Sequence, residues 1–88
     1  MSTKRTKTMT VKQAIALAEV RELVASGEAA FRRRRSRLSE ADVANAVGVT
    51  AAAVSRWENG QRFPTGAPAL VYGRLLKELG DVDHDVST

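Results

Sequence analysis

The chain has 88 residues and no cysteine, with 43% hydrophobic and 27% charged residues. These totals are typical of one small soluble globular domain, and they exclude a disulfide framework or a thiolate metal site. We expect no membrane contact and a cytoplasmic location, because no stretch approaches the roughly 18 apolar residues of a membrane span and the N-terminus lacks a signal peptide. The formal net charge of +4 favours a polyanionic partner.

The chain is predicted to begin with a basic arm and one helix. Residues 1–10 contain basic residues among Ser and Thr without apolar periodicity, so we expect a flexible arm there. Thr10 and Gln13 have the spacing of a capping box, which predicts a helix that begins directly after Thr10. Apolar residues recur every three or four positions through Val24, and Ser26-Gly27 then breaks the pattern.

The segment 28–37 is rich in Ala and Arg, which favour helix, and it starts with an acid at the positive end of that helix. Its basic residues have two interpretations. They can form a phosphate-facing patch, or they can be the solvated face of a helix. The residues concerned are Arg32, Arg34, Arg35 and Arg37.

Two short helices joined by a tight turn follow. Ser39 and Asp42 have the spacing of a cap at the start of a helix, which Gly48 ends. A second helix over residues 51–59 starts only three residues later, and Thr50 can cap it.

The remainder of the chain is predicted to be a loop and one long helix. Residues 61–67 hold Pro and Gly and form the loop, and Pro68 suits the first turn of a helix that ends at Gly80. We expect residues 81–88 to be a disordered acidic tail. Because every ordered segment is helical, the sequence predicts an all-α fold with one compact domain over residues 11–80.

The most specific pattern is the segment 38–60, LSEADVANAVGVTAAAVSRWENG. It resembles the helix-turn-helix of the lambda repressor and Cro superfamily, also called the xenobiotic-response-element class, with the motif at residues 39–59. The likeness extends over about residues 27–79, and the leading helix is an addition to the five-helix domain of that family. The resemblance implies a lambda repressor-like helical fold that binds double-stranded DNA.

The residue types give this pattern a physical basis. Ala44 is small where two helices cross closely, and Gly48 permits the positive φ that a tight turn often needs. Valines form an apolar seam beneath both helices, and Trp57 falls on the inner side of the second one. In such a unit the second helix projects from the body, and its early exposed side chains reach base edges in the major groove.

The resemblance implies that one face of the second helix reads bases, with the residues Ala51, Ala52, Ser55 and Arg56. The alanines can pack against thymine methyl groups, while Arg56 can donate to guanine O6 and N7. In the alternative interpretation the alanines only favour helix formation and Arg56 only meets phosphate.

Phosphate contacts are expected from helix ends and from the loop after the second helix, where amides and basic groups can face the DNA backbone. The residues are Ser39, Thr50, Asn59, Gln61 and Arg62. Ser39 and Thr50 also have a complete explanation as helix caps.

The resemblance also concerns the arginine-rich helix. It implies that Arg33 pairs with Glu58 as a structural ion pair, which makes Glu58 a brace and not a catalytic acid. The family more often has an apolar residue at the Arg32 site and a small residue or Gly at the Arg37 site. The helix register there can therefore differ from that of the family.

Together these features predict a sequence-specific, double-stranded DNA-binding transcriptional regulator, a phage or bacterial repressor or Cro-like protein that acts by occupying its operator. A homodimer on DNA is expected, since two half-sites one helical turn apart suit a two-fold dimer. The first or the last helix can supply the dimer face, or each can simply complete the core.

The alternative is an antitoxin-type interaction protein that binds a protein partner and autoregulates through the same motif. We expect neither an enzyme nor a cofactor or metal, because the sequence holds no nucleophile beside a base, no phosphate-cradling loop and no metal cluster.

Overall fold

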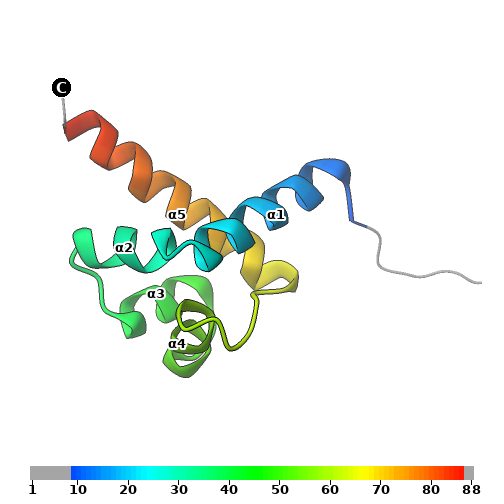
Figure 1. Ribbon diagram of the computed structural model, residues 1–88, viewed down its shortest axis with the longest axis horizontal. Coiled ribbons are helices and arrows are strands. Elements are labelled where there is room, and N and C mark those ends of the chain that lie inside the picture. The colour runs from blue at the N-terminus through cyan, green and yellow to red at the C-terminus, as the bar shows by residue number, and fades with distance from the viewer. Residues whose placement is uncertain (1–8, 87–88) are drawn as a thin grey trace, which may run out of the picture.

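The computed structural model describes residues 9–86, and these form five α-helices without a strand. The helices are α1 (Val11–Ala25), α2 (Glu28–Arg35), α3 (Glu40–Val47), α4 (Ala51–Glu58) and α5 (Gly66–Val86). Figure 1 shows α3 and α4 next to each other on one side of the molecule, with α1 and α5 crossing on the other side. The predicted all-α fold is confirmed.

Three helices start at the residues that the sequence predicts, because a side chain caps each of them. The Thr10 hydroxyl accepts a hydrogen bond from the amide of Gln13 at 3.0 Å, and the Gln13 side chain accepts one from the amide of Thr10 at 3.0 Å. Ser39 and Asp42 make the same reciprocal pair, and Thr50 accepts from the amide of Ala53. These caps satisfy amides that have no partner inside the helix. Most of the expected basic arm, residues 1–8, lies outside the described residues.

The last helix continues past its predicted end. We expected Gly80 to end it, whereas α5 runs on to Val86, well into the segment predicted to be disordered. Gly80 has another role, since a Cβ atom at this position would lie 2.8 Å from the Nη1 atom of Arg32. Its missing side chain therefore makes room for a guanidinium from α2. No helix within residues 9–86 combines the length and the apolar character needed to cross a membrane.

All five helices contribute to one hydrophobic core. Its largest members include Trp57 and Tyr72, whose ring centroids lie 4.9 Å apart. Such an aromatic pair adds about 1 kcal/mol to the stabilisation that comes from burying the two rings. The prediction that Trp57 belongs to the core is confirmed, because its side chain is 5% exposed.

The predicted apolar stripe of α1 is only partly buried. Val20 and Val24, in the second half of the helix, are buried against the rest of the core. Val11 and Ile15, in the first half, are 76% and 55% exposed. The second half of α1 therefore completes the core, while Val11 and Ile15 of the first half face outward.

Candidate nucleic-acid interface

The helix α4 has one buried side and one open side. Val54 and Trp57 point into the core, where Val54 is fully buried. The opposite side carries the residues predicted to read bases: Ala51, Ala52 and Arg56 are exposed and Ser55 is half-buried. None of the protein's own helices covers this outward side among the described residues, so it is available to a ligand.

The turn between α3 and α4 fixes how α4 is presented. Gly48 adopts a left-handed conformation with φ of 90° and donates its amide to the carbonyl oxygen of Ala44 at 2.8 Å. Val49 donates to the same oxygen at 3.0 Å, which closes the end of α3. Ala44 itself is buried, and its small side chain allows the two helices to pack closely. Because a residue with a Cβ is disfavoured at this φ, glycine suits the turn.

The residues predicted to contact phosphate lie at the surface, and several of them already form hydrogen bonds within the protein. The hydroxyls of Ser39 and Thr50 accept the cap hydrogen bonds and remain exposed. The side-chain amide of Asn59 lies 3.4 Å from the Ser55 hydroxyl. Gln61 donates its backbone amide to the carbonyl of Arg56 at 2.9 Å, and the residue is exposed. Arg62 is exposed in the loop after α4.

Arg33 joins the end of α4 to α2. Its Nε and Nη2 atoms donate to the two carboxylate oxygens of Glu58 at 2.6 and 2.9 Å, and its Nη1 atom donates to the carbonyl of Leu38 at 3.0 Å. The two side chains are 12% and 4% exposed. The hydrogen bond to Glu58 raises the pKa of Arg33 above its ordinary value. An acid is unfavourable at the C-terminal end of a helix, so the Arg33 fork is what stabilises Glu58 there.

The other arginines of α2 point to different surroundings. Arg32 binds Glu28 at 2.8 Å and donates to the carbonyl of Leu76 at 2.9 Å, so it ties α2 to α5. Arg34 and Arg35 are exposed, and the Arg35 guanidinium lies over the ring of Phe31. The run of arginines is therefore neither one patch nor one solvated face.

Helix α2 ends in a regular motif despite an unusual residue. Arg37 has a φ of 62° and is the one residue other than glycine with a positive φ among residues 9–86. The amide of Leu38 donates to the carbonyl of Arg33, and the amide of Arg37 donates to that of Arg34. These are the two hydrogen bonds of a Schellman motif, which favours glycine at the left-handed position. The arginine at this site is thus accommodated by a strained backbone, and the helix still places Arg33 against Glu58.

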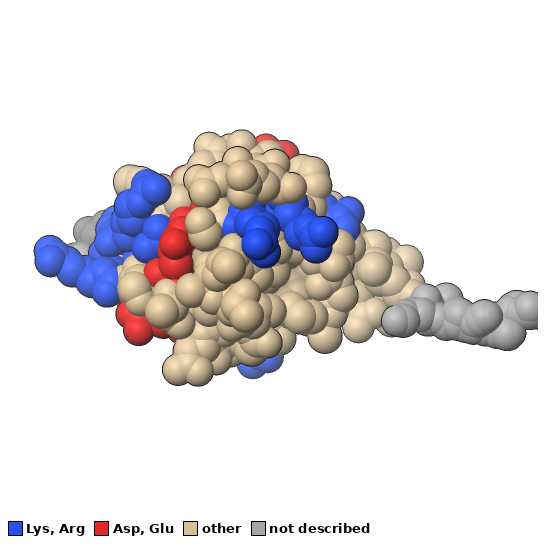
Figure 2. Space-filling model, turned by 90° about the horizontal axis from the view of Figure 1, so that it is seen from below, with Lys and Arg blue, Asp and Glu red and all other residues tan. Residues whose placement is uncertain are grey.

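Basic side chains gather on the face that α3 and α4 form. Figure 2 shows Lys and Arg residues there in two groups, one at an end of the molecule and one nearer its middle, with acidic side chains beside the first. Arg56 and Arg62 are exposed on α4 and on the loop that follows it. A positive surface of this kind attracts the phosphates of a nucleic acid.

One basic residue near this loop was missed by the sequence analysis. Arg21, on α1, places its guanidinium 5.9 Å from the centroid of the Phe63 ring. Its position next to the buried Val20 marks it as lying at the edge of the core face of α1. The contact with a residue 42 positions later in the chain is long-range, and helical periodicity carries no signal for it.

The comparisons with known proteins agree with this geometry. A family model described as a helix-turn-helix domain matches residues 28–81. The chain therefore belongs to the helix-turn-helix domain family, a class of DNA-binding proteins. The match covers α2, α3 and α4 and most of α5, and α1 lies outside it. The search of curated proteins found no match, and the search of solved structures found none either.

Proposed function

We propose that the protein is a sequence-specific, double-stranded DNA-binding transcriptional regulator of the repressor or Cro-like type. It acts in the cytoplasm of a bacterium or of a phage-infected cell by occupying its operator, with α4 in the major groove. The observation that carries this proposal is the open outward side of α4, on a helix whose other side is anchored in the core. Its family and the basic surface around α4 support the same function.

In this proposal Arg56 is the main polar base reader, because its long fork can reach guanine O6 and N7 together. Ala51 and Ala52 contact thymine methyl groups, and Ser55 completes the reading face. Ser39, Thr50, Asn59, Gln61 and Arg62 contact phosphates, which fixes the register of the protein on the duplex. The proposal includes no catalytic role.

The experiment that tests the proposal starts from a pool of random duplexes. Selection by the purified protein should enrich one sequence, and fluorescence anisotropy should then measure its affinity at several salt concentrations. We expect the enriched duplex to bind at least about 1,000-fold more tightly than random DNA, with an affinity that falls steeply as salt rises. Equal binding to every duplex, or binding that salt does not weaken, would contradict the proposal.

We further propose that the protein binds DNA as a homodimer through the flank that α3 and α5 form. Val71 is 45% exposed on α5 and lines a hollow of about 250 Å³ with Ala46 of α3. Arg74 and Glu78 lie at this hollow with strongly exposed side chains, so two copies related by a two-fold axis can set opposite charges against each other. In this dimer the α4 helices of the two copies would contact one duplex, each at its own half-site.

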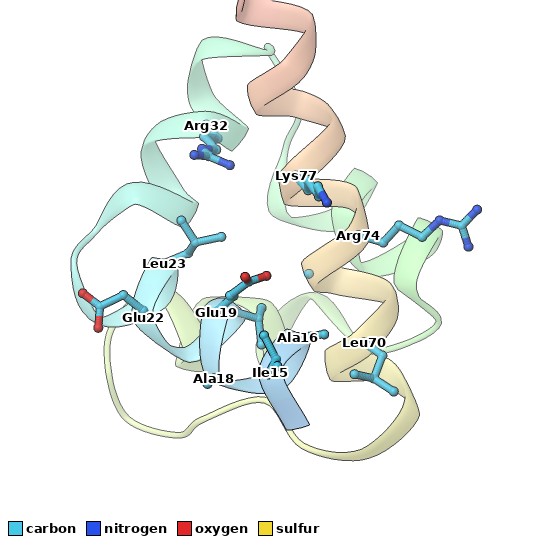
Figure 3. A pocket seen from close by; sticks show the side chains of 12 residues that line it. Ile15, Ala16, Ala18, Glu19, Glu22, Leu23, Arg32, Leu70, Arg74 and Lys77 are labelled. Carbon is cyan, nitrogen blue, oxygen red and sulfur yellow. The ribbon is translucent and has the colours of Figure 1, made fainter. Parts of the chain in front are cut away.

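A second candidate function, the antitoxin-type protein, is favoured by one observation. A groove of about 770 Å³ lies between α1, α2 and α5, and Ile15, Leu23 and Leu70 give it an apolar lining (Figure 3). Because this groove is lined by α1, α2 and α5 and not by α4, a protein partner seated there would leave the outward side of α4 free for DNA. In this case the protein isolated from native cells should hold a second small protein in stoichiometric amount. That second protein should be toxic when expressed alone, and co-expression of the protein described here should relieve its toxicity. A lone dimer that binds its operator tightly favours the first function.

A further inference from the structure

We propose that Arg21 of α1 is an additional binding site for a phosphodiester group of DNA and that the ring of Phe63 positions it. The proposal rests on the proposed DNA-binding function and deepens it. Arg21 lies outside the segment 28–81 that matches the family, so the family assigns it no role. It would make α1 part of the DNA-binding surface, in addition to its part in the core.

The placement of Arg21 on α1 is the first argument. Val20 and Val24 point into the core, while Ile15, Glu19 and Glu22 line the groove on one side of that core face. At 100° per residue, Arg21 projects on the other side of the core face. There it meets Phe63, which belongs to the loop that follows α4.

The loop itself is the second argument. Phe63 directly follows Arg62, and both are exposed. Phe63 is 52% exposed, which is a high value for a large aromatic side chain, and the guanidinium of Arg21 lies over its ring. Arg21 and Arg62 thus bring two positive charges to one short loop at the end of the recognition helix, where a phosphate backbone can pass.

The chemistry of the Arg21 side chain is the third argument. Its Nε atom is buried and has no hydrogen-bond partner within the described residues, and the ion pairs found there do not include Arg21. A cation is attracted to the face of an aromatic ring, which holds the guanidinium without neutralising it. A planar guanidinium matches the geometry of a phosphate, and a side chain that is already held loses less freedom on binding. An arginine held in place without a counter-ion is therefore suited to an outside anion.

The test measures how the DNA affinity of the full chain depends on salt. The Arg21→Gln variant is titrated with the enriched duplex and with a random duplex between about 50 and 200 mM salt. We expect the slope of log K against log salt to fall by about one ion and the affinity to fall about 3- to 10-fold on both duplexes alike. Lys77→Gln is the matched control, because it removes one positive charge from an exposed site at the groove of α1 and α5. Its slope should stay close to that of the wild type.

Two further variants separate binding from folding. Arg21→Lys retains the charge and loses the planar fork, so it should restore the slope while the affinity stays below that of the wild type. Phe63→Leu should weaken binding by a smaller factor at an unchanged slope, because the charge remains but is no longer held. Thermal unfolding of each variant checks that it is folded.

The outcomes distinguish this inference from the proposed function. If the wild type shows no salt-sensitive DNA binding, the proposed function fails. If the wild type binds its site while Arg21→Gln and Lys77→Gln have the same slope, the function stands and the role of Arg21 is overturned. A loss of slope in Arg21→Gln that Arg21→Lys does not restore would also overturn it, because the effect would then not come from the charge.

Discussion

The outward side of α4 combines one long basic residue, Arg56, with two alanines that carry no hydrogen-bonding groups. Such a surface has few ways to recognise a base through hydrogen bonds. The proposed specificity therefore depends strongly on Arg56, with the alanines providing contacts to methyl groups and a close approach of the helix backbone to the bases.

Arg56→Ala should weaken binding to the preferred site about 10- to 100-fold, since a bidentate pair with guanine discriminates by about 1–3 kcal/mol. Binding to random DNA should change much less. The control variant is Arg62→Ala, which should weaken binding to the preferred site and to random DNA equally and should lower the slope of log K against log salt by about one ion. Anisotropy titrations measure both, and an equal loss on every sequence for Arg56→Ala would remove it as a base reader.

The ion pair between Glu58 and Arg33 is the second feature in which single residues have a large effect, in this case on stability. Because both side chains are almost fully buried, Glu58→Gln removes the carboxylate that accepts from Nε and Nη2 of Arg33, and only the carboxylate of Glu40, 3.9 Å from Nη2, remains as a charged neighbour. We expect a loss of about 3 kcal/mol in the free energy of unfolding, measured with urea. Glu22→Gln is the control, since Glu22 is exposed on α1 and belongs to none of the ion pairs found in the described residues, so its substitution should change the free energy of unfolding by less than about 0.5 kcal/mol. A small effect at Glu58 would mean that the pair does not brace α4.

At the scale of the elements, the strain at the end of α2 can be measured directly. Arg37→Gly should stabilise the protein by about 1 kcal/mol, because glycine adopts the left-handed conformation of this residue without a steric penalty. Arg37→Ala is the matched control, since it removes the same side chain and keeps the Cβ. Thermal unfolding should show a gain for the glycine variant alone, and an equal gain for alanine would mean that the charge and not the backbone matters.

The cap of α3 predicts a dependence of stability on pH. The hydrogen bond from the backbone amide of Ser39, and to a smaller extent that from its side chain, lower the pKa of Asp42 below its ordinary value. The folded state therefore binds a proton less readily than the unfolded state, and the stabilisation is complete above about pH 4, the ordinary value. It is lost as pH falls through the lowered pKa. The difference in unfolding free energy between the wild type and Asp42→Asn should be constant near neutral pH and should shrink in that acid range.

How well each element could be predicted depends on how local its cause is. The starts of α1, α3 and α4 follow from caps made by residues three positions apart, so the sequence was sufficient. The end of α5 was predicted wrongly because Gly80 faces Arg32, which is 48 positions away in the chain. The roles of Arg32 and Arg34 could not be separated in advance, since their partners lie in other helices or in solvent. The outward side of α4 was predictable from the family pattern, whereas the contact between Arg21 and Phe63 needed the assembled fold.

For the molecule as a whole, the proposed dimer gives a prediction about its assembly. Val71→Asp should raise the dissociation constant of the dimer about tenfold or more, because a charge replaces a side chain whose burial contributes about 2 kcal/mol. Analytical ultracentrifugation with and without operator DNA measures this. Ile15→Asp, in the groove between α1 and α5, is the control and should leave the dimer unchanged. If only the Ile15 variant dissociates, the dimer face is the groove.

The burial of Val20 and Val24 has a consequence for any attempt to isolate the DNA-binding unit. These two valines pack into the same core as Tyr72 and Leu76 of α5, although α1 lies outside the matched segment 28–81. A fragment trimmed to that segment would expose this apolar surface to water and would tend to unfold or aggregate. A transfer of the helix-turn-helix segment to another protein therefore has to include α1.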